Sequence, residues 1–228
     1  MSLNVHVGLA VALFFGIVPS LRGAPPIHAG ERHTAEPPTA AVQALDTLLT
    51  RWVLQPEGSE ARYRVREQLA GFDFPNDAVG TTSAVSGSIV VTSEGAVVPD
   101  GSVFRVDLAS LATDNDRRDN YVRQRTLEVE EYPEAVLVPR RFVGLPFPLP
   151  ETGAVRFQLE ADLTLHGVTA PTVWEIMAQV TPASITGLAS TSFTFDTFGL
   201  AVPRVARVLS VADDIRLELE FRMAPESD

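Results

Sequence analysis

The chain has 228 residues, a formal net charge of −11 at pH 7, no cysteine and no lysine. These counts exclude disulfides, thiol nucleophiles, cysteine metal sites and lysine Schiff-base chemistry. The negative charge opposes binding to nucleic acid or to anionic membrane surfaces. The length allows one ordinary domain with extensions, and such a domain can bury a core without disulfide or metal cross-links.

Residues 1–30 are predicted to be a targeting segment. The apolar run Val7–Val18 would extend about 18 Å as a helix, which is short of the ~30 Å hydrocarbon core of a membrane. Small residues follow at Ala24 and Ala29, as in a secretory signal peptide. An uncleaved N-terminal anchor is the alternative. The expected location is periplasmic or extracellular.

Residues 31–51 are predicted to be a proline-rich linker that ends in a short helix. The helix is suggested by apolar residues at near-helical spacing: Val42, Leu45, Leu48, Leu49 and Trp52. The folded domain is then expected to span residues 52–224.

From Trp52 onward the pattern is almost entirely that of β-strands. The clearest segment is Val155–Leu165, in which apolar and polar residues alternate without a break. Such a period of two predicts a long antiparallel strand with one dry face and one wet face. Further strands are expected over 62–66, 85–91, 104–108, 135–143, 172–180, 184–195 and 208–223. About eight strands of this kind must form a sandwich or close into a barrel.

One segment interrupts the strands. Thr113–Val129 begins with acidic residues, continues with arginines and contains no glycine or proline. It is predicted to be a helix or helical turn, capped by Thr113 or Asp114.

Three segments together resemble the YceI-like family. They are Gly101–Ala135, with its Arg-Asp pair and Glu-x-Tyr-Pro element; Asp162–Pro171, with its Thr-x-His-Gly-Val-Thr element; and Phe195–Leu200, with its Phe-Gly element. The resemblance covers about Trp52 to Ala224. It implies an all-β fold, a lipocalin-like antiparallel barrel of about eight strands, in an exported protein that holds a long isoprenoid or similar lipid.

The chain departs from the family pattern at the expected mouth of the barrel. Arg66, Glu67 and Gln68 stand where the family tends to carry a histidine. Tyr121 stands after the Arg-Asp pair where the family often has a histidine, and Phe195 stands where an arginine is frequent. These changes make the predicted mouth less cationic, which argues against a charged ligand head group.

The residues alone leave open whether such a barrel is filled or hollow. Ala161, Gly187 and Ala189 are small residues at inward positions beside Phe157 and Phe193, which would leave room for a ligand. They could equally fit the taper of a filled core. The resemblance favours the ligand-binding interpretation.

The candidate ligand contacts are inward or mouth residues: Phe104, Tyr121, Phe157, Ala161, Leu163, Trp174, Phe193 and Phe195. Arg118, Asp119 and His166 are the predicted polar rim. Arg118 and Asp119 either pair with each other and cap local backbone or form a gate. His166 either bonds to backbone in its turn or contacts ligand. No pattern in the sequence predicts a metal, a cofactor or a catalytic set.

The hypothesis from the sequence is an exported, non-enzymatic barrel that binds or carries a long apolar ligand of isoprenoid type. Burial gains about 0.8 kcal/mol per methylene, whereas association costs roughly 4 to 15 kcal/mol, so long chains are favoured. The alternatives are an extracellular interaction or stress-related barrel with a filled core, and an enzyme acting on a lipid-like substrate. A homodimer is left open.

Overall fold

The structure is a computed structural model that describes residues 49–71, 73–204 and 208–226. The expected targeting segment and most of the expected linker lie outside the described residues. The described chain forms ten strands. They are β1 Leu49–Leu54, β2 Glu60–Leu69, β3 Asn76–Thr82, β4 Val85–Thr92, β5 Val97–Asp107, β6 Glu134–Val143, β7 Gly153–Leu165, β8 Val168–Val180, β9 Ile185–Phe193 and β10 Val208–Pro225.

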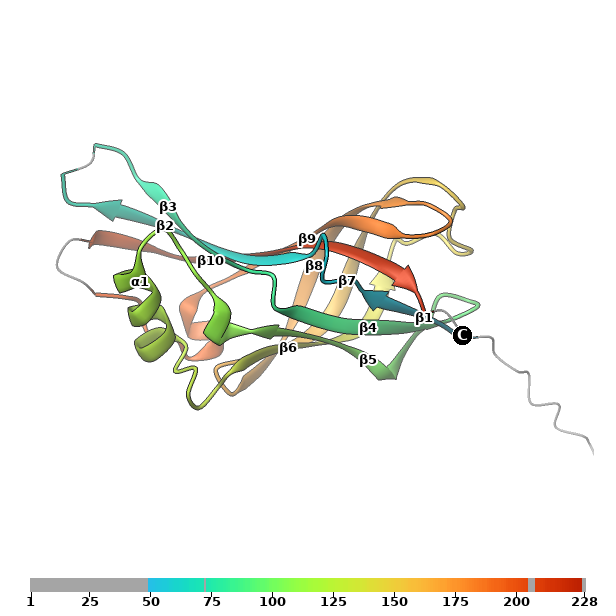
Figure 1. Cartoon of the computed structure of the whole chain (residues 1–228), viewed down its shortest axis with the longest axis horizontal. Coiled ribbons are helices and arrows are strands. Elements are labelled where there is room, and N and C mark those ends of the chain that lie inside the picture. Colours follow the sequence, from blue (N-terminus) through green and yellow to red (C-terminus); the bar gives the residue numbers. More distant parts are fainter. Residues whose placement is uncertain (1–48, 72, 205–207, 227–228) are drawn as a thin grey trace, which may run out of the picture. The chain divides into compact units, whose positions relative to one another are not determined.

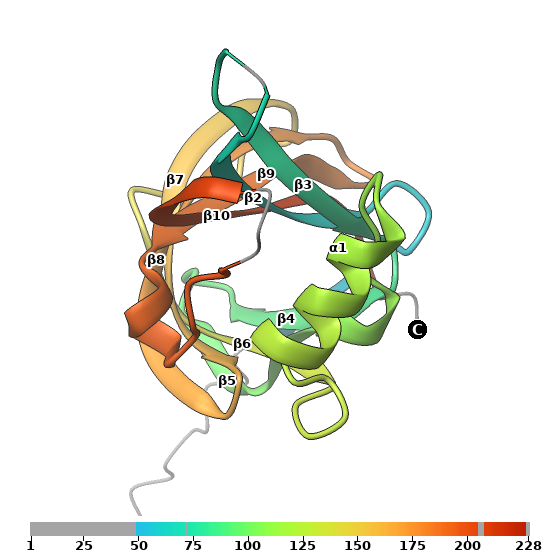
Figure 2. The same cartoon turned by 90° about the vertical axis from the view of Figure 1, so that its left-hand side faces the viewer.

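The strands close into an antiparallel barrel. Their hydrogen-bonded order is β1-β4-β5-β6-β7-β8-β9-β10-β2-β3, and β1 also pairs with β10. This last pairing closes a ring of eight strands, which Figure 2 shows from the end that bears α1. The lipocalin-like barrel expected from the sequence is therefore confirmed.

The β2–β3 hairpin extends the wall beyond this ring. The long strand β10 pairs with β1 through Met223–Pro225 and with β2 through Val208–Glu220, along the same edge. The hairpin and the start of β10 therefore project together at one end, on the left in Figure 1.

Strands β7 and β8 form the longest continuous pair, registered from Gly153↔Val180 to Leu165↔Val168. A strand of 13 residues spans about 43 Å. Leu159, Ala161, Leu163 and Leu165 are buried, whereas the polar residues that alternate with them are partly exposed. The alternation predicted for this segment is confirmed, and its apolar side faces the interior.

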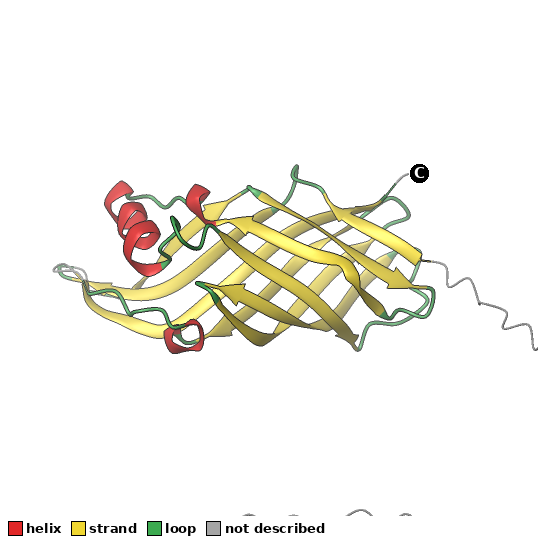
Figure 3. Ribbon diagram, turned by 90° about the horizontal axis from the view of Figure 1, so that it is seen from below, coloured by secondary structure: helices red, strands yellow, loops and turns green. Residues whose placement is uncertain are grey.

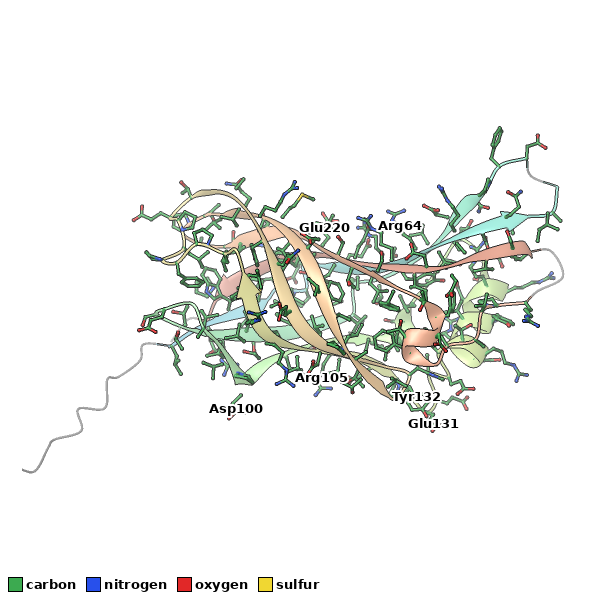
Figure 4. All side chains as sticks on the ribbon, turned by 180° about the vertical axis from the view of Figure 1, so that it is seen from behind. Arg64, Asp100, Arg105, Glu131, Tyr132 and Glu220 are labelled. Carbon is green, nitrogen blue, oxygen red and sulfur yellow. The ribbon has the colours of Figure 1, made fainter. Side chains whose placement is uncertain are left out.

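Arginine and glutamate side chains form a ladder on the outer face of β2 and β10. Glu218 accepts from Arg64 Nε at 3.0 Å, and Glu220 accepts from Arg62 Nη2 at 3.0 Å. Arg64 and Glu220 are labelled in Figure 4. Burial alone would raise the pKa of the Glu218 carboxyl, but Arg64, Arg216 and Arg62 outweigh it and lower the pKa. These ion pairs link β2 to β10 across the sheet.

The helical segments gather at one end of the barrel (Figure 3). They are α1 Asp116–Tyr121, the π-helical turn η2 Val122–Thr126, and the 3₁₀ turns η1 Leu108–Ser110 and η3 Phe195–Phe198. The helix expected after Thr113 is present, but the predicted cap is wrong. Asn115 caps α1, because its side-chain oxygen accepts from the backbone N–H groups of Arg117 and Arg118.

The short helix expected to end near Trp52 is wrong where the described residues cover it. Leu49–Leu54 is extended and pairs with β4 from Leu49↔Thr92 to Val53↔Ser88. Pairing with two strands overrides the near-helical spacing of the apolar residues.

Candidate ligand-binding cavity

The barrel encloses a cavity of about 750 Å³. This volume lies within the ~300 to 1,000 Å³ typical of ligand sites. Strands around the whole ring line it with apolar side chains, among them Leu54, Ile89, Val91, Leu137, Leu159, Ile176, Ala189, Leu217, Leu219, Phe221 and Met223. The arrangement suits an apolar molecule shielded from water.

Six of the eight predicted contact residues line the cavity: Phe104, Tyr121, Phe157, Leu163, Trp174 and Phe195. The other two, Ala161 and Phe193, are not among its lining residues. Phe193 instead packs edge-to-face on Phe198, with ring centroids 4.6 Å apart.

Ala161 is screened by its neighbours on β8. It lies opposite Thr172, whose hydroxyl donates to the Ala161 carbonyl at 3.1 Å. Trp174 Nε1 donates to the same hydroxyl at 3.0 Å, which directs the indole toward this pair. Ala161 is consequently 2% exposed within packed structure.

The small inward residues do not all make room. Ala189 lines the cavity. At Gly187, by contrast, a Cβ atom would stand 2.4 Å from the Met177 carbonyl oxygen and 2.9 Å from the Phe221 ring. Gly187 therefore allows close packing of β9 on β8, and of the three small residues only Ala189 borders the ligand space.

The loop between β6 and β7 closes the end away from α1. Its Leu145, Phe147 and Leu149 line the cavity. The Phe147 ring lies against Gly95 in the β4–β5 turn, where a Cβ atom would stand 2.2 Å from it. Apolar side chains thus seal this end.

The opposite end, here called the α1 mouth, reaches solvent. Ala70, Asn115 and Arg117 are exposed and yet line the cavity. The polar lining side chains of α1 and of the end of β2 also gather here. The cavity therefore opens to solvent at the α1 mouth and is apolar deeper in the barrel.

An ion pair joins α1 to β2 at the mouth. Arg118 Nη2 donates to Glu67 Oε1 at 2.8 Å, and Arg118 also pairs with Asp114 at 2.5 Å. The Glu67 side chain is only 9% exposed. Burial alone would lower the pKa of the Arg118 guanidinium, but the two carboxylates raise it. The inward position of Glu67 could have been predicted by extending the alternation of Tyr63 and Val65 by one step.

Two lining hydroxyls have no hydrogen-bond partner within the described part of the chain. They are Tyr63 Oη on β2 and Thr126 Oγ1 at the end of η2. Burial raises the pKa of Tyr63 to about 12, partly opposed by the Arg118 charge. The sequence analysis did not identify either residue, because only the folded backbone shows which hydroxyls lack a partner.

Asp119 and His166, predicted as rim residues, are not among the lining residues. The Asp119 carboxylate accepts from Thr113 N at 2.9 Å and from Thr113 Oγ1 at 2.6 Å, which fixes the chain before α1. It therefore caps local backbone and makes no ion pair with Arg118.

His166 occupies the β7–β8 turn with a left-handed φ of 51°. Its Nε2 lies 3.1 Å from Glu128 Oε2, and its ring meets Tyr132 edge-on at 4.8 Å. Tyr132 also covers Gly167, where a Cβ atom would be 2.7 Å from the tyrosine ring. These contacts hold the turn against the segment after η2.

The described residues contain neither a metal-binding cluster nor a helix suited to cross a membrane. No three His, Asp or Glu side chains come together there as a metal site would need. No helix within residues 49–71, 73–204 and 208–226 is long and apolar enough to cross a membrane.

Residues 52–223 match the model of the YceI-like domain. The chain belongs to the YceI-like family. It is also 32% identical, over 138 residues, to UPF0312 proteins of Pseudomonas syringae and Pseudomonas savastanoi. The alignment covers 59% of this chain and spans 65% of the length of these curated relatives.

Solved structures share the fold of this YceI-like chain. A polyisoprenoid binding domain from Saccharophagus degradans superimposes with a TM-score of 0.59 at 13% identity, covering 77% of this chain and 98% of that one. Burkholderia cenocepacia BcnA gives a TM-score of 0.54 at 13% identity, with 76% and 99% covered. The Campylobacter jejuni YceI protein gives 0.53 at 16% identity, with 71% and 91% covered.

Proposed function

We propose that this YceI-like protein binds a long, largely apolar ligand of isoprenoid type in its barrel and carries it outside the cytoplasm without chemical change. The observation that carries this proposal is the cavity of about 750 Å³ with its mainly apolar lining. A structural neighbour of the same fold is named a polyisoprenoid binding domain, which supports the same ligand class.

The energetics favour a long chain over a short one. Association costs roughly 4 to 15 kcal/mol, and each buried methylene returns about 0.8 kcal/mol. A ligand must therefore bury on the order of 5 to 20 carbons before apolar contact alone holds it. The cavity extends from the α1 mouth to the β6–β7 loop, which provides the depth that such a chain requires.

The polar groups in the wall support binding without catalysis. The Arg118 guanidinium is engaged by Glu67 and Asp114. The histidine of the domain, His166, lies outside the cavity against Glu128. Carriage outside the cytoplasm is supported by the apolar run Val7–Val18, which has the length of a signal peptide core.

Organic extraction of the purified protein, followed by mass spectrometry, tests the proposal. We expect an apolar compound with a long chain to be recovered in about one copy per protein. Extracts without such a compound, together with no binding of added geranylgeraniol, would contradict the proposal and would favour a purely structural barrel.

A further inference from the structure

Three buried polar atoms in the described residues lack a hydrogen-bond partner: Arg62 Nε, Tyr63 Oη and Thr126 Oγ1. The guanidinium of Arg62 makes ion pairs with Glu60 and Glu220 on the outer face of the barrel. All three side chains line the cavity, but the Tyr63 and Thr126 hydroxyls make no such outer-face bond. An oxygen on a molecule in the cavity could pair with them.

The two hydroxyls lie on elements that border the α1 mouth. Tyr63 lies on β2 four residues before Glu67, so the two side chains share a face of the strand. The charges of Arg118, Asp119 and Asp114 all affect the pKa of Tyr63. Thr126 lies on η2, which continues directly from α1, and is 8% exposed. Both therefore belong to the α1 mouth.

The Tyr63 ring is held in place by the sheet. It lies across Gly80, its register partner on β3, where a Cβ atom would stand 2.2 Å from the ring. A side chain fixed in this way presents its hydroxyl at a defined position. A buried donor left unsatisfied is costly, whereas one that meets an acceptor oxygen on a ligand is not.

The charges at the mouth do not match an anionic ligand. Arg118 is already paired with Glu67 at 2.8 Å and with Asp114 at 2.5 Å. Arg117, which also lines the mouth, is exposed, so salt and water screen its charge. A phosphate placed here would lie beside the Glu67 carboxylate without an uncommitted buried cation.

We propose that the α1 mouth recognises a neutral, oxygen-bearing head, a hydroxyl or a carbonyl, on the apolar ligand. Tyr63 donates to the head oxygen, and Thr126 donates to it or accepts from it. Both residues determine specificity for a neutral head over a phosphate. This inference rests on the proposed function, because it concerns the end of the ligand whose chain occupies the barrel.

Three probes of equal chain length test the head group: geranylgeraniol, its phosphate monoester and the parent hydrocarbon. The two tryptophans of the chain, Trp52 and Trp174, both line the cavity, so quenching of their fluorescence reports binding. We expect the alcohol to bind more tightly than the hydrocarbon by about three- to tenfold, the worth of one net hydrogen bond. The phosphate is expected to bind more weakly than the alcohol.

Two variants remove one hydroxyl each. Tyr63→Phe keeps the ring on Gly80, and Thr126→Val keeps the branched shape of the side chain. Each should reduce the preference for the alcohol over the hydrocarbon, by up to about three- to tenfold, without lowering hydrocarbon affinity. The control is Tyr132→Phe, because the Tyr132 hydroxyl donates to Glu131 at 2.8 Å outside the cavity. If one variant fails to fold, the other provides the same comparison.

The outcomes separate this inference from the proposed function. Equal affinity for all three probes, or tightest binding of the phosphate, would overturn the neutral-head inference and leave the apolar cavity in place. An alcohol preference that survives in both variants would also overturn it. If the hydrocarbon, the alcohol and the phosphate all fail to bind, the proposed function is itself wrong.

Discussion

Arg118 on α1 donates a hydrogen bond of 2.8 Å to Glu67, which is buried on the inward face of β2. The pair fastens the only α-helix of the described residues to the wall of the barrel at the point where the cavity opens. The helix that shapes the α1 mouth is therefore held to it by charge.

Arg118→Leu should destabilise the protein more than the loss of an exposed ion pair would. The change leaves Glu67 buried without its partner, and Arg118 is itself 21% exposed, so we expect a loss of about 1 to 3 kcal/mol. Arg105→Leu is the matched control, because Arg105 and Glu134 also lie 2.8 Å apart but are 47% and 45% exposed. That change should cost about 0 to 1 kcal/mol. Equal losses in urea unfolding would contradict a special role for the pair.

The Tyr63 hydroxyl should make stability fall at alkaline pH. The pKa of Tyr63 is raised from 10.0 to about 12 by burial, so between these values the unfolded chain loses the phenolic proton and the folded chain keeps it. The stability that this group contributes is complete below pH 10 and declines as pH rises toward about 12. The midpoint temperature of thermal unfolding, measured across this pH range, should fall less steeply with pH in Tyr63→Phe than in the unchanged protein. Identical slopes in the two proteins would contradict the burial of the hydroxyl.

Apolar alternation in the sequence predicted the strands because one residue in two faces the interior, whereas the barrel was implied by the resemblance to the YceI-like family. The alternating residues 155–165 accordingly lie within β7. The end of the predicted helix, at Leu49 and Trp52, is instead part of β1, since near-helical spacing does not show pairing with a strand as remote in sequence as β4.

The site was predictable only in part. Most aromatic contacts could be placed on the inward face from the alternation alone. The pattern could not show that Ala161 is kept from the cavity, because that depends on the hydrogen bond between Trp174 and Thr172 on the neighbouring strand. Whether the hydroxyls of Tyr63 and Thr126 have hydrogen-bond partners depends on which groups meet inside the folded barrel, and no local sequence pattern carries that information.

Affinity should rise with chain length and hardly change with salt. Each additional buried methylene contributes about 0.8 kcal/mol, so isoprenoid alcohols should gain roughly fourfold per carbon until the cavity is filled. Moderate salt screens exposed charges but not apolar burial. Titration of farnesol and geranylgeraniol at low and moderate salt provides the comparison. A steep loss of affinity with salt would mean that charge at the α1 mouth, through Arg117 or Arg118, dominates binding.

Filling the cavity from one of its small lining residues should remove binding without unfolding the barrel. Ala189 on β9 is 7% exposed and borders the cavity, so Ala189→Phe would project a ring into the ligand space. We expect a stability change below the ~1 to 3 kcal/mol of an overpacked core, together with a large loss of extracted lipid and of geranylgeraniol binding. Ser192→Phe is the control, since Ser192 lies on the same strand with its side chain exposed. Ala161→Phe, in packed structure beside Thr172, should instead destabilise the fold by the full overpacking cost. Unchanged lipid capture by a folded Ala189→Phe protein would show that the ligand does not occupy the barrel.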